Sequence, residues 1–253
     1  MIRSMFNLLR FIKRYKFYLI GFCIALLIAG NQYFLIQYGK WLSPEDNVLK
    51  SDIIVSQNAA VGRLATSLNL LKSGQSEMLI TVALSKKLLR EIMLEEHIEE
   101  KLIDKIYFGG CVSPTTFDDA INTLDALKKL GFKNKSITVV SEKYCLRRMK
   151  MIFQHVLGSD FHVKTSPTVH PSLAMRKVLS SDYWWHDDYT TRAVIIETQK
   201  TIFYWINYIV LGRKTSLDIP VNEVSELFSD WRATDQNHLK KIYEGIKNYC
   251  NEA

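Results

Sequence analysis

Short apolar segments rich in β-branched residues alternate with helical segments between Asp52 and Thr165, and this alternation restricts the fold more than any other feature. Strands that alternate with helices of 10–15 residues imply right-handed crossovers and a parallel sheet with helices on both faces. We therefore expect a Rossmann-like α/β domain of about five strands. The expected strands are Asp52–Ser56, Glu77–Ala83, Ile103–Phe108, Ser136–Ser141 and Asp160–Thr165, and the expected helices are Ala59–Ser73, Ser85–Glu96, Pro114–Lys129 and one that ends near Leu157.

An uncharged apolar run, Phe17–Ile36, precedes this domain. Twenty helical residues extend about 30 Å, the thickness of a hydrocarbon core. The basic flank 1–16 contains no acidic residue, which predicts a single-pass anchor with a cytoplasmic N-terminus and the domain on the other side of the inner membrane. A cleaved signal peptide and a buried helix of a soluble protein are the alternatives; Ile28 fits the −3 position of a cleavage site poorly.

The remaining boundaries follow from composition. We expect a spacer at 37–51, the α/β domain at 52–215 and a C-terminal helical extension at 216–253. Thr190–Leu211 reads as a long apolar helix, but Glu197 and Lys200 lie inside it. Because a bilayer would bury both charges at a cost of several kcal/mol, we interpret this helix as one that packs on the domain, with a second span as the alternative.

The positive charge is concentrated at one end of the chain. The net charge is +7, and five of the cations lie within the first sixteen residues. Elsewhere 28 Lys and Arg face 26 Asp and Glu, so the domain lacks the broad basic surface of a nucleic-acid-binding protein.

The helix start Ser113–Asp119 is the clearest candidate for a site. Ser113 before Pro114 suits an N-cap, and Thr116 with Asp119 offers a second capping pair. Free N–H groups at such a helix end favour a phosphate or carboxylate, whereas plain capping is the alternative.

A second candidate is the turn Ser141–Arg148 after the fourth strand. It carries Tyr144 and the pair Arg147 and Arg148, and one of these guanidinium groups is expected to face the ligand crevice and bind an oxyanion. A solvated basic helix face would explain the same residues.

Other chemistries have little support. The chain contains no GxGxxG, P-loop, GxSxG or HExxH motif. The triplet His186-Asp187-Asp188 is a weak metal candidate, and we predict no metal site. Cys111 and Cys145 each follow a predicted strand, so a disulfide between them is a hypothesis if the domain faces an oxidising compartment.

Three motifs give a family resemblance. Asp52-Ile-Ile-Val-Ser followed by Arg63, Leu70 and Gly74 is similar to D-x-h-h-V-L-G then R-x(6)-L-x(3)-G. Ser113-Pro-Thr-Thr-Phe-Asp-Asp-Ala resembles S-x-N-T-x-E-N-A, and Val140-Ser-Glu-Lys-Tyr-Cys-Leu-Arg-Arg-Met resembles V-T-S-x-Y-H-x-x-R-A. These motifs belong to the domain of unknown function 218 family, of the YdcF, SanA and ElyC type, and they cover about 52–165.

The resemblance implies a bacterial envelope protein, because many members carry an N-terminal membrane anchor and several are linked to envelope integrity and peptidoglycan-lipid metabolism; a soluble member binds S-adenosylmethionine. This chain departs from the pattern: Gln57-Asn58-Ala59 replaces glycines, and Cys145 replaces the histidine. Without these glycines a ligand cannot approach the backbone as closely. Without the histidine an obvious general acid or base is missing, so the resemblance implies an altered site.

These observations predict a membrane-anchored envelope protein that binds an anionic small molecule or lipid-linked headgroup, with a function in cell-wall or envelope biogenesis. The predicted ligand contacts are Arg63, Ser113, Thr116, Asp118, Tyr144 and Arg148; no cofactor and no catalytic residue is assigned. Two alternatives stay open. One is a noncatalytic envelope scaffold or interaction protein with a degenerate pocket, and the other is a hydrolase or transferase that uses Cys145 as nucleophile.

Overall fold

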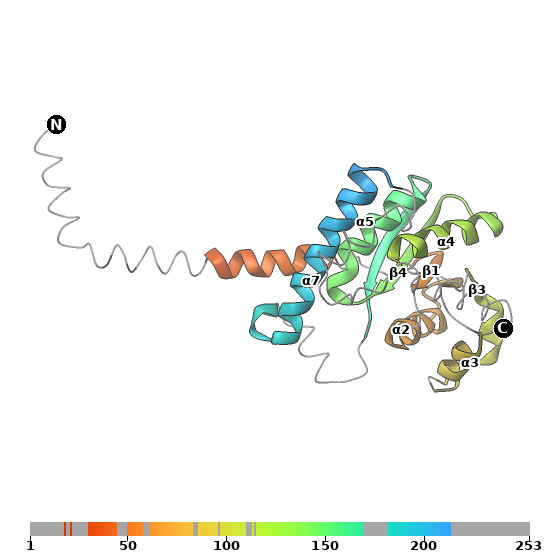
Figure 1. Cartoon of the computed structure of the whole chain (residues 1–253). Helices are drawn as coiled ribbons and strands as arrows, with labels where there is room; N and C mark the ends of the chain where they lie inside the picture. The colour runs from red at the N-terminus through yellow and green to blue at the C-terminus, as the bar shows by residue number, and fades with distance from the viewer. Residues whose placement is uncertain are drawn as a thin grey trace, which may run out of the picture.

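A five-stranded parallel sheet forms the centre of the computed structural model (Figure 1). Its strands are β1 (Ile53–Gln57), β2 (Met78–Val82), β3 (Ile106–Phe108), β4 (Lys135–Ser141) and β5 (Phe161–Pro167), in the order β3-β2-β1-β4-β5. The structure describes residues 18, 21, 30–44, 50–57, 61–82, 86–95, 97–109, 113, 115–169 and 182–213. The order and the parallel pairing are those of a Rossmann-like α/β fold, which confirms the predicted fold class.

Helices cover both faces of the sheet. The helices are α2 (Val61–Lys72), α3 (Lys86–Glu95), α4 (Thr116–Lys129), α5 (Leu146–Leu157) and α7 (Asp188–Tyr204). On one face, leucines of α2 and α3 pack on Ile54 and Leu79. On the other, α4, α5 and the end of α7 bury Phe117, Phe153 and Phe203 against Val55 and Val139. The first two crossovers therefore cover one face and the next two cover the other, as the right-handed crossover rule requires.

The short helical elements include one departure from the sequence prediction. They are the 3₁₀ turns η1 (Glu100–Lys105), η2 (Lys143–Cys145) and η3 (Trp184–His186), and a π-helical segment, η4 (Trp205–Val210), that continues α7. The predicted third strand began at Ile103, but Ile103 lies in η1 and β3 begins only at Ile106. Ile103 packs against the core from η1, which accounts for the apolar pattern that resembled a longer strand.

The start of α4 also differs from the prediction. Thr115, rather than Ser113, is the N-cap residue, and Thr116 is the first helical residue. The Asp118 amide donates to the Thr115 hydroxyl, and the Asp118 carboxylate accepts from the Thr115 amide. This reciprocal capping box satisfies two backbone donors at once, which neither predicted pair does.

A helix of residues 30–42 runs toward α7 (orange in Figure 1) and packs on the domain through its last two turns. It crosses the predicted boundary between the anchor, 17–36, and the spacer, 37–51, so the first part of that spacer belongs to a docked helix. Among the described residues, no helix is both long and apolar enough to cross a membrane. Of the predicted anchor, the structure describes only residues 18, 21 and 30–36.

Three other predicted segments have different outcomes. The basic flank 1–16 and the helical extension 216–253 lie outside the described residues. The long helix expected at Thr190–Leu211 is present as α7 and η4 and packs on α5 through Arg148 and Glu197.

Candidate functional site

The switch point of the sheet lies between β1 and β4, where the chain reverses the direction in which it adds strands. In open parallel sheets, ligands bind in the crevice beyond the carboxyl ends of the two strands at such a point. The last paired residues there are Ser56 of β1 and Val140 of β4. Gln57 and Ser141, which follow them, are therefore the side chains nearest to the expected crevice.

Unpaired polar groups are concentrated at this position. Both polar atoms of the Gln57 side-chain amide and the Ser141 Oγ are buried without a hydrogen-bond partner among the described residues. Asp119 Oδ1, in the first turn of α4, is in the same condition. Because a buried polar atom without a partner costs about 1–3 kcal/mol, three such residues at one edge indicate a place for a ligand or ordered water. The predicted contacts did not include Gln57, Ser141 or Asp119.

Asp119 is electrostatically unusual. Burial raises the pKa of its carboxyl to about 7, while a hydrogen bond from Ser113 and the positive charges of Arg63 and Arg148 oppose that rise. The carboxyl therefore lies within electrostatic reach of both predicted arginine contacts. Near neutral pH it exists in both protonation states, so it can either donate or accept a hydrogen bond.

Arg148, predicted as a ligand contact, is engaged inside the protein. Its Nε and Nη2 atoms each lie 2.8 Å from Glu197 Oε2, and its Nη1 donates to Thr116 Oγ1 at 2.5 Å. The guanidinium also lies over the Tyr204 ring, 5.4 Å from its centroid. The Glu197 charge raises the pKa of Arg148 against the opposing effect of burial. Thr116 and Arg148 are thus brought together as expected, but as parts of a buried ion-pair cluster.

The start of α4 is filled by the chain's own groups. Besides the capping box, the Tyr204 hydroxyl forms hydrogen bonds with Thr115 and Thr116, and the Ser113 hydroxyl donates to the Thr115 carbonyl at 3.2 Å. Asp118 serves as the reciprocal cap. Of the three predicted contacts here, Asp118 therefore caps the helix, Thr116 binds Arg148 and Ser113 binds the Thr115 carbonyl.

Arg63 is less enclosed than Arg148. It extends from α2 to Glu142, immediately after β4, and its Nε lies 2.7 Å from Glu142 Oε2; its Nη2 pairs with the same oxygen. The Glu142 side chain is 41% exposed, against 8% for Glu197. The Arg63 guanidinium can therefore exchange its partner for an incoming anion more readily than Arg148 can.

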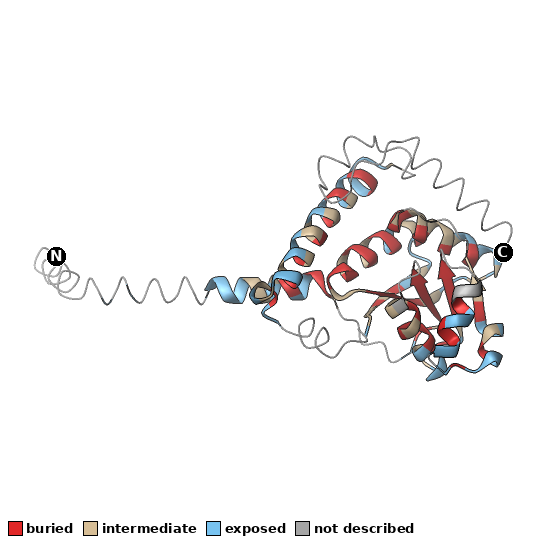
Figure 2. Cartoon of the chain, turned by 60° about the horizontal axis from the view of Figure 1, so that its bottom comes forward, coloured by how far each residue is buried: buried red, intermediate tan, exposed pale blue. Residues whose placement is uncertain are grey.

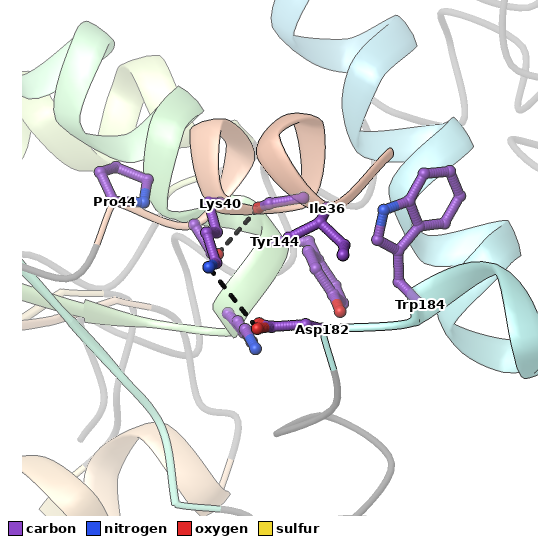
Figure 3. Close-up of a pocket in the computed structure, with 9 residues that line it drawn as sticks. Ile36, Lys40, Pro44, Tyr144, Asp182 and Trp184 are labelled. Carbon is purple, nitrogen blue, oxygen red and sulfur yellow. Dashed lines mark hydrogen bonds and ion pairs between the residues drawn. The ribbon is translucent and has the colours of Figure 1, made fainter. Parts of the chain in front are cut away.

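Tyr144 points elsewhere. It lines a cavity of about 310 Å³ between η2, the helix of residues 30–42 and the segment that carries Asp182 and Trp184 (Figure 3). Its hydroxyl is buried without a partner among the described residues, and burial together with the Asp182 charge raises its pKa to about 12. Lys40 forms an ion pair with Asp182 across this cavity. Tyr144 is thus the one predicted contact that faces the docked helix.

Cys145 lacks the properties of a nucleophile. The thiol is free and buried, and burial, with Glu197 nearby, raises its pKa to about 12. A reactive thiolate needs a lowered pKa, so the structure opposes the Cys145 hydrolase or transferase. Cys111, the other half of the proposed disulfide, lies outside the described residues.

The residues considered as a metal candidate have structural contacts. Asp187 caps α7 by accepting from the Thr190 amide at 2.9 Å, and Asp188 pairs with Arg192. Among the residues that the structure describes, no group of three or more His, Cys, Asp and Glu side chains could hold a metal ion.

Comparisons with known proteins do not place the chain in a family: no family model matches it, and neither does any curated protein or solved structure. The resemblance noted from the motifs accordingly stays a prediction.

Proposed function

We propose that this chain is a membrane-anchored protein of the bacterial cell envelope whose α/β domain binds an anionic small molecule or a lipid-linked headgroup, in cell-wall or envelope biogenesis. The ligand binds at the carboxyl ends of β1 and β4. The observation that carries the proposal is the set of unpaired, buried groups of Gln57, Ser141 and Asp119 at the switch point.

The ligand's chemistry follows from these donors and acceptors. The Gln57 amide and the Ser141 hydroxyl can both donate to an oxygen-rich group. Arg63 supplies the positive charge once Glu142 turns toward solvent, since a guanidinium binds phosphate or carboxylate in a bidentate manner. Asp119 tolerates an anion because its pKa of about 7 allows it to be protonated.

The position of the site favours the lipid-linked class. The segment after β4 contacts the docked helix, since Arg147 Nε donates to the Trp41 carbonyl at 2.8 Å and stacks over the Trp41 ring. Trp41 lies five residues beyond the predicted anchor, 17–36. The carboxyl edge of β4 therefore lies on the side of the domain from which the anchor enters.

The alternative is a noncatalytic envelope scaffold or interaction protein with a degenerate pocket. The buried cluster of Arg148, Glu197 and Thr116 favours this alternative. In that cluster the Arg148 guanidinium binds other residues of the protein and is not available to a ligand. A scaffold requires no ligand at Gln57 and Ser141.

Thermal unfolding of the full chain in detergent separates these proposals. Inorganic phosphate and dioctanoyl phosphatidic acid are the two probes, and a probe present at 100 times its Kd stabilises the native state by about 2.7 kcal/mol. A rise in Tm with the lipid alone identifies a lipid-linked ligand, and a rise with both identifies a free anion. We expect Ser141→Ala to raise about tenfold the probe concentration that is needed for the same rise in Tm. No response to either probe would favour the scaffold.

A further inference from the structure

Exposed aromatic side chains surround the outer part of the docked helix. Tyr33 and Phe34, on the helix itself, are 66% and 64% exposed, and Tyr189, at the start of α7, is 56% exposed. Tyr183, which is 47% exposed, and Trp185, which is half-buried against the cluster that contains Leu42 and Trp184, extend the group at η3, with ring centroids 5.4 Å apart. We call these five residues the aromatic collar. Figure 2 shows the outer end of the helix exposed and its inner end buried where it meets the domain.

The helix cannot swing relative to the domain, which gives the collar a defined position. Trp184 Nε1 donates to the Leu35 carbonyl at 2.9 Å, and the Tyr38 hydroxyl and Thr198 Oγ1 lie 2.6 Å apart. Gly39 permits this close approach, since a Cβ atom there would lie 2.7 Å from Trp184 Cδ1. Leu42 completes the contact by packing in the same buried cluster as Trp184.

The collar therefore lies at the level where the predicted anchor ends. Leu35 is the second-last residue of the uncharged run 17–36, and its carbonyl contacts Trp184, next to Trp185. Five residues further along the helix, about 7–8 Å, Lys40 pairs with Asp182 and marks the aqueous side. The collar thus occupies the level between hydrocarbon and water.

We propose that the aromatic collar rests in the outer interface of the lipid bilayer and sets the height and orientation of the α/β domain. Tyr and Trp prefer that interface because their rings are apolar and their tips are polar. The collar is continuous with the docked helix and contains no Leu, Ile or Val, so a bilayer interface suits it better than an apolar protein core. This inference rests on the membrane anchor of the proposed function.

A collar at the interface would fix the orientation of the α/β domain relative to the bilayer. Since Arg147, in the first turn of α5, also contacts the docked helix at the Trp41 carbonyl, a collar at the interface holds the carboxyl edge of β4 within reach of the lipid surface. A ligand attached to a lipid could then enter the switch point without leaving the membrane.

Site-directed spin labelling of the full chain in phosphatidylcholine and phosphatidylglycerol vesicles tests this proposal. Cys23, Cys111 and Cys250 are replaced by serine, and the buried Cys145 is retained. Labels are placed at Tyr189→Cys in the collar, at Leu26→Cys in the predicted anchor and at Lys128→Cys on α4, which Figure 1 shows on the side of the domain away from the docked helix. Collision with oxygen and with a nickel chelate then reports the depth of each label.

We expect the Tyr189→Cys label at headgroup depth, with nickel accessibility at least threefold below that of the Lys128→Cys label. If the Leu26→Cys label is in the hydrocarbon while the Tyr189→Cys label is as accessible to nickel as the control, the collar proposal is overturned and the anchor stands. A Leu26→Cys label in water overturns the anchor, and the collar proposal with it. A Tyr189→Cys label shielded from both reagents would place a protein segment, such as 214–253, over the collar and also overturn the proposal.

Discussion

Two arginine–glutamate pairs at the carboxyl edge of the sheet differ in how far water reaches them. The pair Arg148–Glu197 is almost completely buried, with side-chain exposures of 7% and 8%, whereas Arg63 and Glu142 are 18% and 41% exposed. The first pair also binds Thr116 and lies against Tyr204. The second pair lies at the same edge as Gln57, Ser141 and Asp119, whose side chains carry unpaired atoms, and the Arg63 charge reaches Asp119.

This difference in exposure indicates which pair stabilises the fold and which pair can exchange its partner for a ligand. A buried charge pair holds α4, α5 and α7 together, because removing Glu197 would leave Arg148 buried without a carboxylate and removing Arg148 would leave Glu197 with only Lys200 beside it. Near the more exposed pair, Gln57 and Ser141 have unpaired polar atoms, and an anion can replace Glu142 as the partner of Arg63. The Arg148 side is therefore structural, and the Arg63 side is the one that we propose for ligand binding.

The largest expected effect comes from breaking the buried pair. Arg148→Met leaves the buried Glu197 with Lys200, 3.4 Å from its Oε1, as its remaining cation, and should lower the free energy of unfolding by about 3 kcal/mol, the lower end of the range for breaking a buried pair. Urea unfolding of the full chain in detergent measures this loss. Arg63→Met is the matched control at the exposed pair, with an expected loss under about 1 kcal/mol. Equal losses in the two variants would contradict the contrast between the pairs.

A pH dependence should follow from Asp119. Its pKa is raised from 3.8 to about 7 in the folded protein, so folding favours the protonated form. The resulting stability is fully present below pH 3.8, falls as the pH rises toward 7 and is absent above it, a change on the order of a few kcal/mol.

Asp119→Asn, which keeps the shape but cannot ionise, should flatten the stability profile between pH 4 and 7 relative to the wild type. Urea midpoints measured at several pH values provide the comparison. The prediction fails if both proteins have the same slope.

A smaller effect of opposite sign is expected at Gln57. Replacing this fully buried, unpaired amide by methionine, as in Gln57→Met, should raise the free energy of unfolding without ligand by about 1 kcal/mol, since an unsatisfied polar group is removed at nearly constant volume. The same variant should lose the response to dioctanoyl phosphatidic acid. A destabilised variant would show that the amide has a partner in the native protein.

The smallest effect on stability is expected for Glu142→Gln. An exposed ion pair contributes about 0.2–1 kcal/mol, so unfolding should change little. Binding of the phosphate probe should tighten by about threefold, because Arg63 no longer has a competing carboxylate. Weaker binding would mean that Glu142, rather than Arg63, contacts the ligand.

Local patterns in the sequence predicted most of the sheet. Segments such as Ser136–Ser141 are β-branched and bounded by polar residues, and they form strands close to the expected limits. The same patterns did not reveal that Arg148 pairs with Glu197, 49 residues further along the chain, because a long-range contact leaves no local periodicity. Nor did they reveal that Tyr204, the last residue of α7, forms hydrogen bonds at the start of α4, where an anion site was expected.

Gln57 and Ser141 were missed although a signal exists. Each is a polar residue at or just after the end of a predicted strand, and the strand order of the structure places the two ends side by side at the switch point. The contacts predicted from the sequence are instead residues with charged or hydroxyl side chains on the flanking helices and turns. At this edge Gln57 and Ser141 are left unpaired, together with one oxygen of Asp119.

The side-chain amide resonance of Gln57 is the most direct test of ligand binding at the switch point. Nuclear magnetic resonance of the ¹⁵N-labelled full chain in detergent would follow it during titration with dioctanoyl phosphatidic acid, with Gln57→Met identifying the signal. We predict that this resonance shifts in a saturable manner and that Arg63→Gln raises the midpoint about tenfold. A probe that binds and shifts other resonances while the Gln57 amide stays unchanged would contradict the account.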